Sequence, residues 1–482
     1  MLRHARYGII SFKTQRKEGR VRSTNNERGW IFLGCLGMAL LSLHVHAADL
    51  DETVLKQLET DAPAPRLDSP AAGPKSRAPV ASARETAPSG PPLTLADAER
   101  MAQDNNPVFK AWREKASALG EQSLAATRWA DPKLKFGISE YPTRNTGGED
   151  PIKMLLAIQQ VVTPAARRQH ESAQLHSMEQ GQSARSAEQK LVVLRETRKA
   201  WLGIYLQYHT AVIIRQTRKV LAQLVEISQN QYRAGTGNQS DVLQAQIELS
   251  LLKDKESQVE TERELGLAEL TRWVGTTLAN RPLAMETIDL PVADDVGRIE
   301  QGLDRLPLLQ ITKLEADAAK EGVEIARSRA TPEWMLEFET HWSSSKDRKF
   351  GNDSVAALVT VDLQFGRKNL QDRWLASSEK DYNSAVFLVA DQRRDLKRML
   401  DLETVNTRRL DERITLYRDV ILPQAAQNAQ AALRAYQAQL ADFSQLMRAR
   451  QKELESKLDV LRLLVERAMV QVNLLYLSGE GV

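Results

Sequence analysis

The sequence predicts a mainly helical protein with a small β part, built from two similar repeats. Aromatic residues are only 5% and charged residues 27% of the 482 residues, which favours long helices with thin apolar seams. Two pairs of short segments instead show an apolar period of two, which indicates strands. A stretch that begins at Tyr232, YRAGTGNQSDVLQAQ, returns 204 positions later at Tyr436 as YQAQLADFSQLMRAR, which indicates an internal duplication.

The duplication keeps its register over most of the chain. The segment NPVFKAWREKASALGEQSLAATRWADPKLKF, from Asn106, aligns with the segment from Leu306 at an offset of 200 residues. Residues that coincide under this offset include Pro107 with Pro307, Ala116 with Ala316, and Pro132 with Pro332. Gly275 aligns with Gly479 at an offset of 204. We therefore expect repeats at 93–280 and 307–479, joined by a connection at 281–306.

Each repeat is expected to contain one opening helix, two short strands, and a very long helical segment that turns back once. The opening helix of the first repeat is expected at 93–129. No proline occurs between Pro164 and Pro282. Residues 165–231 should therefore form one helix of about 100 Å. We expect the same layout in the second repeat, with a long proline-free segment broken only by its turn.

The last helix of the second repeat carries a heptad seam. Its apolar positions alternate spacings of four and three at Leu454, Leu458, Leu461, Val465, Ala468, Val472 and Leu475. That spacing is typical of a left-handed coiled coil. Leu464 and Leu474 widen the stripe, which indicates neighbours on both sides of the helix. The helices alone leave open an ordinary coiled-coil rod.

The alternating segments predict a two-stranded hairpin in each repeat. PKLKFGISEYP and IKMLLAIQQVV form the first pair; PEWMLEFETHW and DSVAALVTVDLQF form the second. Four strands are too few to close a barrel, and the helices offer no globular core to cover the apolar face. We therefore expect lipid to cover it when several chains pool their strands; a soluble sheet packed on helices is the alternative. The predicted lipid-facing residues are Trp334, Phe338, Trp342, Val359 and Phe365.

The N-terminal region is expected to be a targeting segment. Residues 30–43, WIFLGCLGMALLSL, form an apolar stretch behind a basic leader, and VHA follows. This pattern predicts a signal peptide at 1–47, with an uncleaved anchor as the alternative. Residues 48–92 are rich in Pro, Ala and Ser, which predicts a flexible linker. Cys35, the only cysteine, lies in the apolar stretch, so lipid attachment there is an open alternative.

The charge balance argues against a nucleic-acid partner. The chain has 66 Lys and Arg against 63 Asp and Glu, a net charge of +3. Eight of these basic residues and two of the acidic ones precede residue 48, so the expected mature chain is slightly acidic. Phosphate binding needs clustered positive charge. We expect no nucleic-acid partner.

The order of elements resembles that of the TolC-like outer membrane efflux proteins. The resemblance rests on the NPVF opening, the helix ending in ADPKL and the YRAGTGNQSDVLQAQ turn, and it covers about residues 93–479. It implies a homotrimer in the outer membrane of a Gram-negative bacterium. Four strands per chain would form a 12-stranded β-barrel, and the helices an α-barrel tunnel through the periplasm. A periplasmic adaptor and an inner-membrane efflux pump would be its partners. Drugs, metal ions and secreted proteins are all open as cargo, including the cation and heavy-metal branch.

The resemblance places the two helical turns at the periplasmic tip, where they would close the tunnel. The candidate gate and tip residues are Tyr232, Gly235, Gly237, Ser240, Asp241, Tyr436, Ser444, Gln445 and Arg448. Asp241 and Tyr436 occupy gate-linking positions, and a hydrogen bond between them is chemically reasonable. Alternatively, Asp241 is a charge that stabilises a helix N-terminus. Gln445 and Arg448 stand where some relatives carry acidic rings, so a cation-selective entrance is not expected to carry over.

Other classes of function are disfavoured. No HExxH, Walker or GxSxG motif occurs, so we expect neither an enzyme nor a cofactor or metal site. His341 is interpreted as a solvated strand residue, although it could touch a metal in transit. A periplasmic coiled-coil adaptor or scaffold remains an alternative, but its Gly-rich β-domain is not visible and the paired strands disfavour it. The outer membrane component of type I protein secretion is a second alternative.

Overall fold

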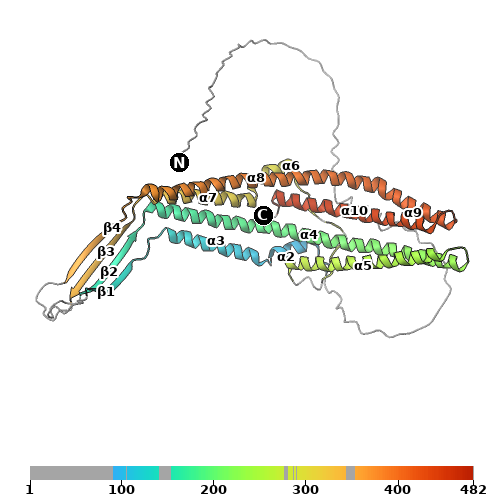
Figure 1. Ribbon diagram of the computed structural model, residues 1–482, viewed down its shortest axis with the longest axis horizontal. Helices are drawn as coiled ribbons and strands as arrows, with labels where there is room; N and C mark the ends of the chain where they lie inside the picture. Colours follow the sequence, from blue (N-terminus) through green and yellow to red (C-terminus); the bar gives the residue numbers. More distant parts are fainter. Residues whose placement is uncertain are drawn as a thin grey trace, which may run out of the picture. The chain divides into compact units, whose positions relative to one another are not determined.

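The computed structural model describes residues 91–104, 106–140, 153–275, 281–285, 287–288, 290–343 and 353–480. All of them belong to one unit, His46–Val482. The predicted signal peptide, Cys35 and nearly all of the predicted linker lie outside the described residues. Figure 1 shows the strands at one end of the long helices of this unit and two helical turns at the other end.

The helices of the first repeat are α2 (Leu95–Asp104), α3 (Pro107–Ala126), α4 (Ala165–Arg233) and α5 (Gln239–Val274). The predicted long helix over 165–231 is thus confirmed as α4. The prediction of one opening helix over 93–129 is wrong, because α2 and α3 are separate. Asn106 accepts a hydrogen bond from the backbone N–H of Val108 (3.1 Å), and Pro107 begins α3. Asparagine at the cap and proline at the first turn both favour a new helix start there.

The connection and the second repeat contain α6 (Val296–Gly302), α7 (Pro307–Ser328), α8 (Gln371–Leu416), α9 (Leu422–Gln437) and α10 (Phe443–Ser478). The expected proline-free run is wrong in this repeat, because Pro423 interrupts it. A π-helical turn at Tyr417–Ile421 separates α8 from α9. Proline has no N–H for the helix ladder, and one wide turn accommodates the lost bond without ending the helix.

The strands β1 (Lys133–Glu140), β2 (Lys153–Val162), β3 (Trp334–Ser343) and β4 (Ser354–Val361) form one antiparallel sheet in the order β1-β2-β3-β4. The two predicted hairpins are confirmed, and β2 pairs with β3 to join them. Apolar and polar residues alternate along these strands. Because adjacent residues in a strand point to opposite faces, the alternation gathers apolar side chains on one face of the sheet.

The core is a set of seams between helices. One buried cluster joins α4, α5, α9 and α10, and a second joins α6, α7, α8 and α10. The heptad positions of α10 are all buried, as predicted, and α10 contributes to both clusters, for example through Leu461 and Leu474. The broad stripe of α10 therefore has neighbours on both sides, as the sequence indicated. None of the described helices has both the length and the apolar content that a membrane crossing requires.

Candidate transport surfaces: the sheet and the helical turns

One face of the sheet is apolar and exposed across all four strands. Phe136 pairs with Leu156, Ile158 with Phe338, and Leu336 with Val359, so apolar side chains continue from strand to strand. The exposed apolar residues on this face are Leu134, Phe136, Ile138, Met154, Leu156, Ile158, Trp334, Leu336, Phe338, Trp342, Val355 and Val359. A continuous apolar surface of this kind marks a site of contact with lipid or with protein.

The opposite face of the sheet carries the charged side chains. Lys135 on β1 forms an ion pair with Glu337 on β3 at 2.7 Å, above the small side chain of Ala157 on β2. His341 lies 3.4 Å from Glu339 on the same face, where the sequence predicted it. The charged groups on this face therefore pair with one another, and the sheet separates an apolar surface from a polar one.

The strand residues predicted to face lipid divide into two groups. Trp334, Phe338, Trp342 and Val359 all lie on the apolar face and are exposed. Phe365 does not belong to a strand, because β4 ends at Val361, and its side chain is 91% exposed. The expectation that the strand reaches Phe365 is wrong for the single chain. Contact of these residues with lipid stays a prediction.

The first helical turn joins α4 to α5 by a glycine-dependent cap. The N–H of Thr236 donates to the carbonyl of Gln231 (2.9 Å), and the N–H of Gly235 donates to that of Tyr232 (3.1 Å). These two bonds form a Schellman motif. Gly235 has φ +71°, a left-handed conformation that favours glycine. A Cβ on Gly237 would lie 3.0 Å from the Cβ of Gln231, so a side chain at this position would require Gln231 to shift.

The second helical turn, between α9 and α10, repeats this cap with one difference. The N–H of Leu440 donates to the carbonyl of Ala435 (2.8 Å), and the N–H of Gln439 donates to that of Tyr436 (3.0 Å). Gln439 occupies the position that Gly235 holds in the first turn, and its φ is +60°. The same backbone turn is therefore built with a residue that finds this conformation less favourable.

Tyr436 joins the two turns. Its ring is buried and packs edge-on against Phe443, with 5.4 Å between the ring centroids. Its hydroxyl donates a hydrogen bond of 2.7 Å to Oε1 of Gln231 at the end of α4. The predicted hydrogen bond from Tyr436 to Asp241 is therefore wrong, because the single hydroxyl proton is directed to Gln231.

Asp241 nevertheless lies in the electrostatic neighbourhood of Tyr436. Burial raises the pKa of Tyr436, and the charge of Asp241 raises it further. Burial raises the pKa of Asp241 itself, and the neighbouring carboxylate of Asp442 adds to the shift. Two carboxylates, one from each turn, thus lie near each other, and one of them, Asp241, lies near Tyr436. This arrangement disfavours ionisation of Asp241 while the turns are in contact.

The other predicted tip residues do not join this group. Tyr232, the counterpart of Tyr436, is exposed, as are Gly235, Ser240, Gln445 and Arg448; Gly237 and Ser444 are half-buried. Sequence reasoning missed Gln231, Asp442 and Phe443. Asp442 precedes α10 at the cap position where aspartate is favoured, so a signal for it was present. Gln231 carried no such signal, because its partner comes from the other hairpin. The role of all these residues in gating stays a prediction.

The described residues do not gather three His, Cys, Asp or Glu side chains in a way that could hold a metal ion. The candidate functional features described above are therefore an apolar sheet face, a charged sheet face, and two turns held together by a hydrogen bond.

Comparison with known proteins agrees with this architecture. No family model matches the sequence. The alkaline protease secretion protein AprF of Pseudomonas aeruginosa is 24% identical over 303 residues, which cover 58% of this chain and 62% of AprF. The match thus spans less than two thirds of the length of this curated relative.

Two solved structures share this fold over most of their length. The outer membrane protein VceC of Vibrio cholerae is 17% identical with a TM-score of 0.66, covering 80% of this chain and 96% of VceC. The open state of the MtrE outer membrane channel of Neisseria gonorrhoeae is 13% identical with a TM-score of 0.63, covering 80% of this chain and 89% of MtrE. The chain therefore has the protomer fold of outer membrane channels. The predicted TolC-like fold, long helices with four strands, is confirmed.

Proposed function

We propose that this protein is the outer membrane channel of a tripartite efflux system and conducts its cargo passively, without chemistry of its own. The observation that carries the proposal is the sheet, which exposes a continuous apolar face and pairs its charges on the other face. In an outer membrane barrel, alternate residues face lipid and the lumen in this way.

The functional form is a homotrimer. Among the described strands, β1 pairs only with β2 and β4 only with β3, so both edges of the sheet are open. Unpaired backbone groups at membrane depth are costly, and a barrel removes them by closing. Three copies would supply the 12 strands implied by the resemblance. The helices α4, α5, α8, α9 and α10 would continue the barrel as a periplasmic tunnel.

The proposed partners are those that the resemblance implies. The tips at α4–α5 and α9–α10 would meet a periplasmic adaptor, and an inner-membrane pump would supply the cargo. The contact between Tyr436 and Gln231 holds the turns together and would keep the tunnel closed. The MtrE outer membrane channel, which has the same fold, was solved in an open state, which supports the idea that a channel of this fold can open.

Type I protein secretion is the second candidate function. The similarity to AprF, whose name assigns it to alkaline protease secretion, is the observation that favours it. The two functions share the channel and differ in cargo and pump.

The test is a reconstitution of the purified protein. The detergent-extracted protein should come from the outer membrane fraction, have the mass of a trimer, and form ion-conducting pores in planar bilayers. A monodisperse monomer in buffer without detergent would refute the proposal. Expression in a host that lacks its own outer membrane channel then separates the cargo classes. Restored resistance to drugs or metal ions indicates efflux, and restored release of a protease indicates secretion.

A further inference from the structure

Two arginine–tryptophan pairs lie where the chain passes between the helices and the sheet. In the first pair, Cζ of Arg168 lies 6.0 Å from the ring centroid of Trp129. In the second pair, Cζ of Arg329 lies 5.4 Å from the ring centroid of Trp374. Both tryptophans are more than half exposed, at 57% and 53%. Each pair therefore presents a positive charge stacked on an open aromatic ring.

The two pairs are built from different positions of the two repeats. Trp129 follows α3 and stacks with an arginine of α4, whereas Arg329 follows α7 and stacks with a tryptophan of α8. The residue types have thus exchanged places between the repeats. Duplication alone would keep each residue type at its own position, so the recurrence of the pair indicates a role for the pair itself.

Both pairs lie just beyond the last row of paired strand residues. In that row, Trp334 on β3 pairs with Val162 on β2 and with Val361 on β4. Arg329 precedes Trp334 by five residues, and Arg168 follows Val162 by six. Trp334 belongs to the exposed apolar face of the sheet. The two pairs therefore lie at the level where this apolar face ends.

Glutamine side chains fix the segments that carry the pairs to the ends of the strands. Nε2 of Gln160 on β2 donates to the carbonyl of Ala130, the residue after Trp129 (2.8 Å). Nε2 of Gln364 donates to the carbonyl of Arg329 (2.7 Å). The level of both pairs relative to the sheet is therefore set by hydrogen bonds.

Neither guanidinium is neutralised within the chain. No ion pair among the described residues includes Arg168 or Arg329. Arg168 donates from Nη1 to the carbonyl of Thr127 (2.5 Å), which is an uncharged acceptor, and its buried Nε has no hydrogen-bond partner in the part of the chain that the structure describes. A positive charge without a partner at the border of an apolar surface is best stabilised by an external anion.

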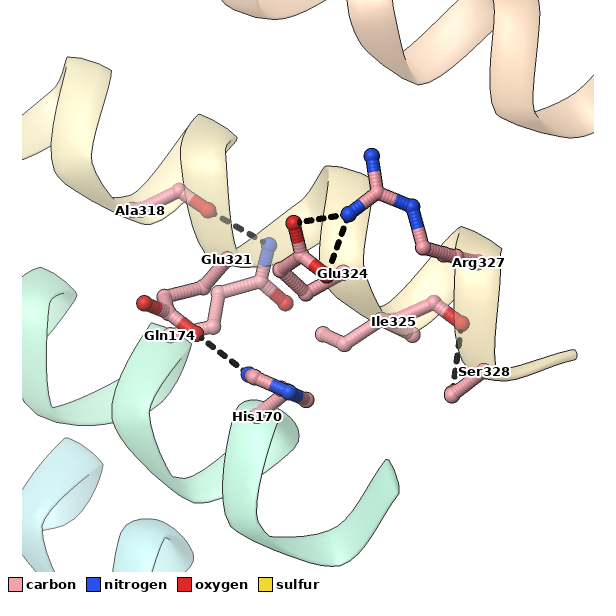
Figure 2. Close-up of polar contacts among 8 residues, drawn as sticks. All are labelled: His170, Gln174, Ala318, Glu321, Glu324, Ile325, Arg327 and Ser328. Atoms are coloured by element: carbon pink, nitrogen blue, oxygen red, sulfur yellow. Dashed lines mark hydrogen bonds and ion pairs between the residues drawn. The ribbon is translucent and has the colours of Figure 1, made fainter. Parts of the chain in front are cut away.

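The arginines next to these two are paired, so the junction is not simply basic. Figure 2 shows Arg327, two residues before the arginine of the second pair, with Nη1 2.7 Å from Oε1 of Glu324. Arg167, which precedes the arginine of the first pair, lies 3.1 Å from Oε1 of Glu333. Two arginines at the junction thus have carboxylate partners, and the two that stack on tryptophan do not.

The start of α4 adds positive potential beside the first pair. Pro164 holds the cap position of this helix, no side chain caps it, and its first turn contains no acidic residue. A helix N-terminus carries a partial positive charge and favours a bound phosphate. Arg167 and Arg168 are the third and fourth residues of α4, where a positive charge is unfavourable for the helix. An anion beside Arg168 would offset this repulsion.

We propose that the two arginine–tryptophan pairs bind the phosphate groups of anionic phospholipids at the border between the apolar sheet face and the helices. Tryptophan favours the headgroup level of a membrane, and a guanidinium binds phosphate through two parallel hydrogen bonds. Acyl chains that cover the apolar face up to Trp334 bring their phosphate groups to this level. The inference rests on the proposed membrane channel and adds the lipid class that the channel binds.

The lipid must carry a net negative charge to satisfy these sites. An anionic headgroup neutralises the unpaired guanidinium. A zwitterionic headgroup brings a cation that the same guanidinium repels, so it is the weaker ligand. We therefore expect preference for phosphatidylglycerol over phosphatidylcholine.

Native mass spectrometry of the purified full-length protein in detergent tests this preference. Phosphatidylglycerol or phosphatidylcholine is titrated into wild type, into the double variant Arg168→Gln with Arg329→Gln, and into the control Arg327→Gln. The control removes a charge that Glu324 already neutralises. Wild type and control should bind phosphatidylglycerol more tightly than phosphatidylcholine. The double variant should bind phosphatidylglycerol about fivefold more weakly at each pair, with phosphatidylcholine binding unchanged.

Equal weakening in the control and the double variant would show that only net charge matters, and an undiminished preference in the double variant would show that the pairs are not the site. Either result overturns the proposal. A large excess of inorganic phosphate should not displace the lipid; displacement would assign the site to a soluble anion and overturn it as well.

The conductance of the same preparations separates this inference from the proposed function. All variants should form conducting trimers, so a loss of lipid preference in a conducting wild type overturns the inference alone. A wild type that forms no conducting trimer fails both. If the double variant is not recovered from membranes, Arg329→Gln decides. The side chain of Arg329 is exposed, and its removal should weaken phosphatidylglycerol binding about fivefold at one pair. Unchanged binding in this variant overturns the proposal.

Discussion

The hydroxyl of Tyr436 donates a 2.7 Å hydrogen bond to Oε1 of Gln231 and so ties the second helical turn to the first. The repeat-equivalent tyrosine, Tyr232, is 49% exposed, whereas Tyr436 is 6% exposed. Equivalent residues therefore have different roles in the two turns. In a trimer the Tyr436–Gln231 bond would occur three times around the tunnel mouth.

Tyr436→Phe is expected to raise the resting conductance of the purified trimer in a planar bilayer. The change removes the donor and leaves the ring packed on Phe443, at a cost of about 1 kcal/mol per chain. Tyr232→Phe is the matched control and should leave the conductance unchanged, because its ring is exposed. Equal conductance of wild type and Tyr436→Phe would show that this bond takes no part in closing the tunnel.

Conductance should also depend on pH through Asp241. Burial and the neighbouring Asp442 raise the pKa of Asp241 while the turns are in contact. A raised pKa means that the contact binds the proton more tightly than the separated turns do. The stabilisation is therefore present at low pH and is lost as the pH rises through the raised pKa. We expect single-channel conductance to fall as the pH is lowered from about 7 towards about 4. Asp442→Asn removes the repulsion and should reduce this dependence; an unchanged pH profile would contradict the assignment.

The orientation of the sheet predicts opposite outcomes at adjacent residues. Val359 lies on the apolar face beside Leu336, and Thr360 lies on the other face beside Met335. Val359→Arg should reduce the amount of protein in the outer membrane fraction, because arginine on the lipid face of a barrel costs about 2–4 kcal/mol at mid-bilayer. Thr360→Arg should be tolerated, since that side chain faces water. Equal loss for both variants would indicate a soluble sheet buried on both faces.

The interior of the helical bundle contains a polar pair whose loss should destabilise the fold. The hydroxyl of Tyr476 on α10 donates to Oε1 of Glu188 on α4 at 2.5 Å, and burial raises the pKa of both groups. Tyr476→Phe should lower the free energy of unfolding by about 1.5–3 kcal/mol, because a buried carboxyl group loses its donor. The double variant with Glu188→Leu should recover much of the loss, as followed by circular dichroism during thermal unfolding. No recovery would mean that the tyrosine acts through packing alone.

The long elements of the fold could be predicted because each depends on a local pattern. The period of two gives the strands, and the absence of proline over 165–231 gives α4. The break before α3 and the π-helical turn before Pro423 were missed, although Asn106, Pro107 and Pro423 were visible in the sequence. In both places a single residue changes one or two backbone hydrogen bonds, which a broad pattern does not register.

The site was less accessible to prediction because it depends on contacts between hairpins. The sequence indicates that Tyr436 and Asp241 lie at the tips, since both are placed by the repeat. The choice of Gln231 over Asp241 as hydrogen-bond acceptor depends on how the α4–α5 hairpin packs against the α9–α10 hairpin, which no local pattern encodes. At Phe365 the alternation misled the prediction, because it continues past Val361 although β4 ends there. β3 begins at Trp334, the partner of Val361, and so offers Phe365 no residue to pair with.

The two caps provide a final prediction that uses the repeat as its own control. Gly235 and Gln439 occupy the same position of the Schellman motif, with φ of +71° and +60°. A residue with a side chain pays about 1 kcal/mol in this conformation, and glycine does not. Gln439→Gly should therefore stabilise the second turn, and Gly235→Gln should destabilise the first by a similar amount. Hydrogen exchange of the amides of Thr236 and Leu440, which close the two motifs, measures each turn separately. Exchange should slow at Leu440 in the first variant and quicken at Thr236 in the second; a change at the opposite turn, or in the opposite direction, would show that the backbone conformation does not control the stability of the tips.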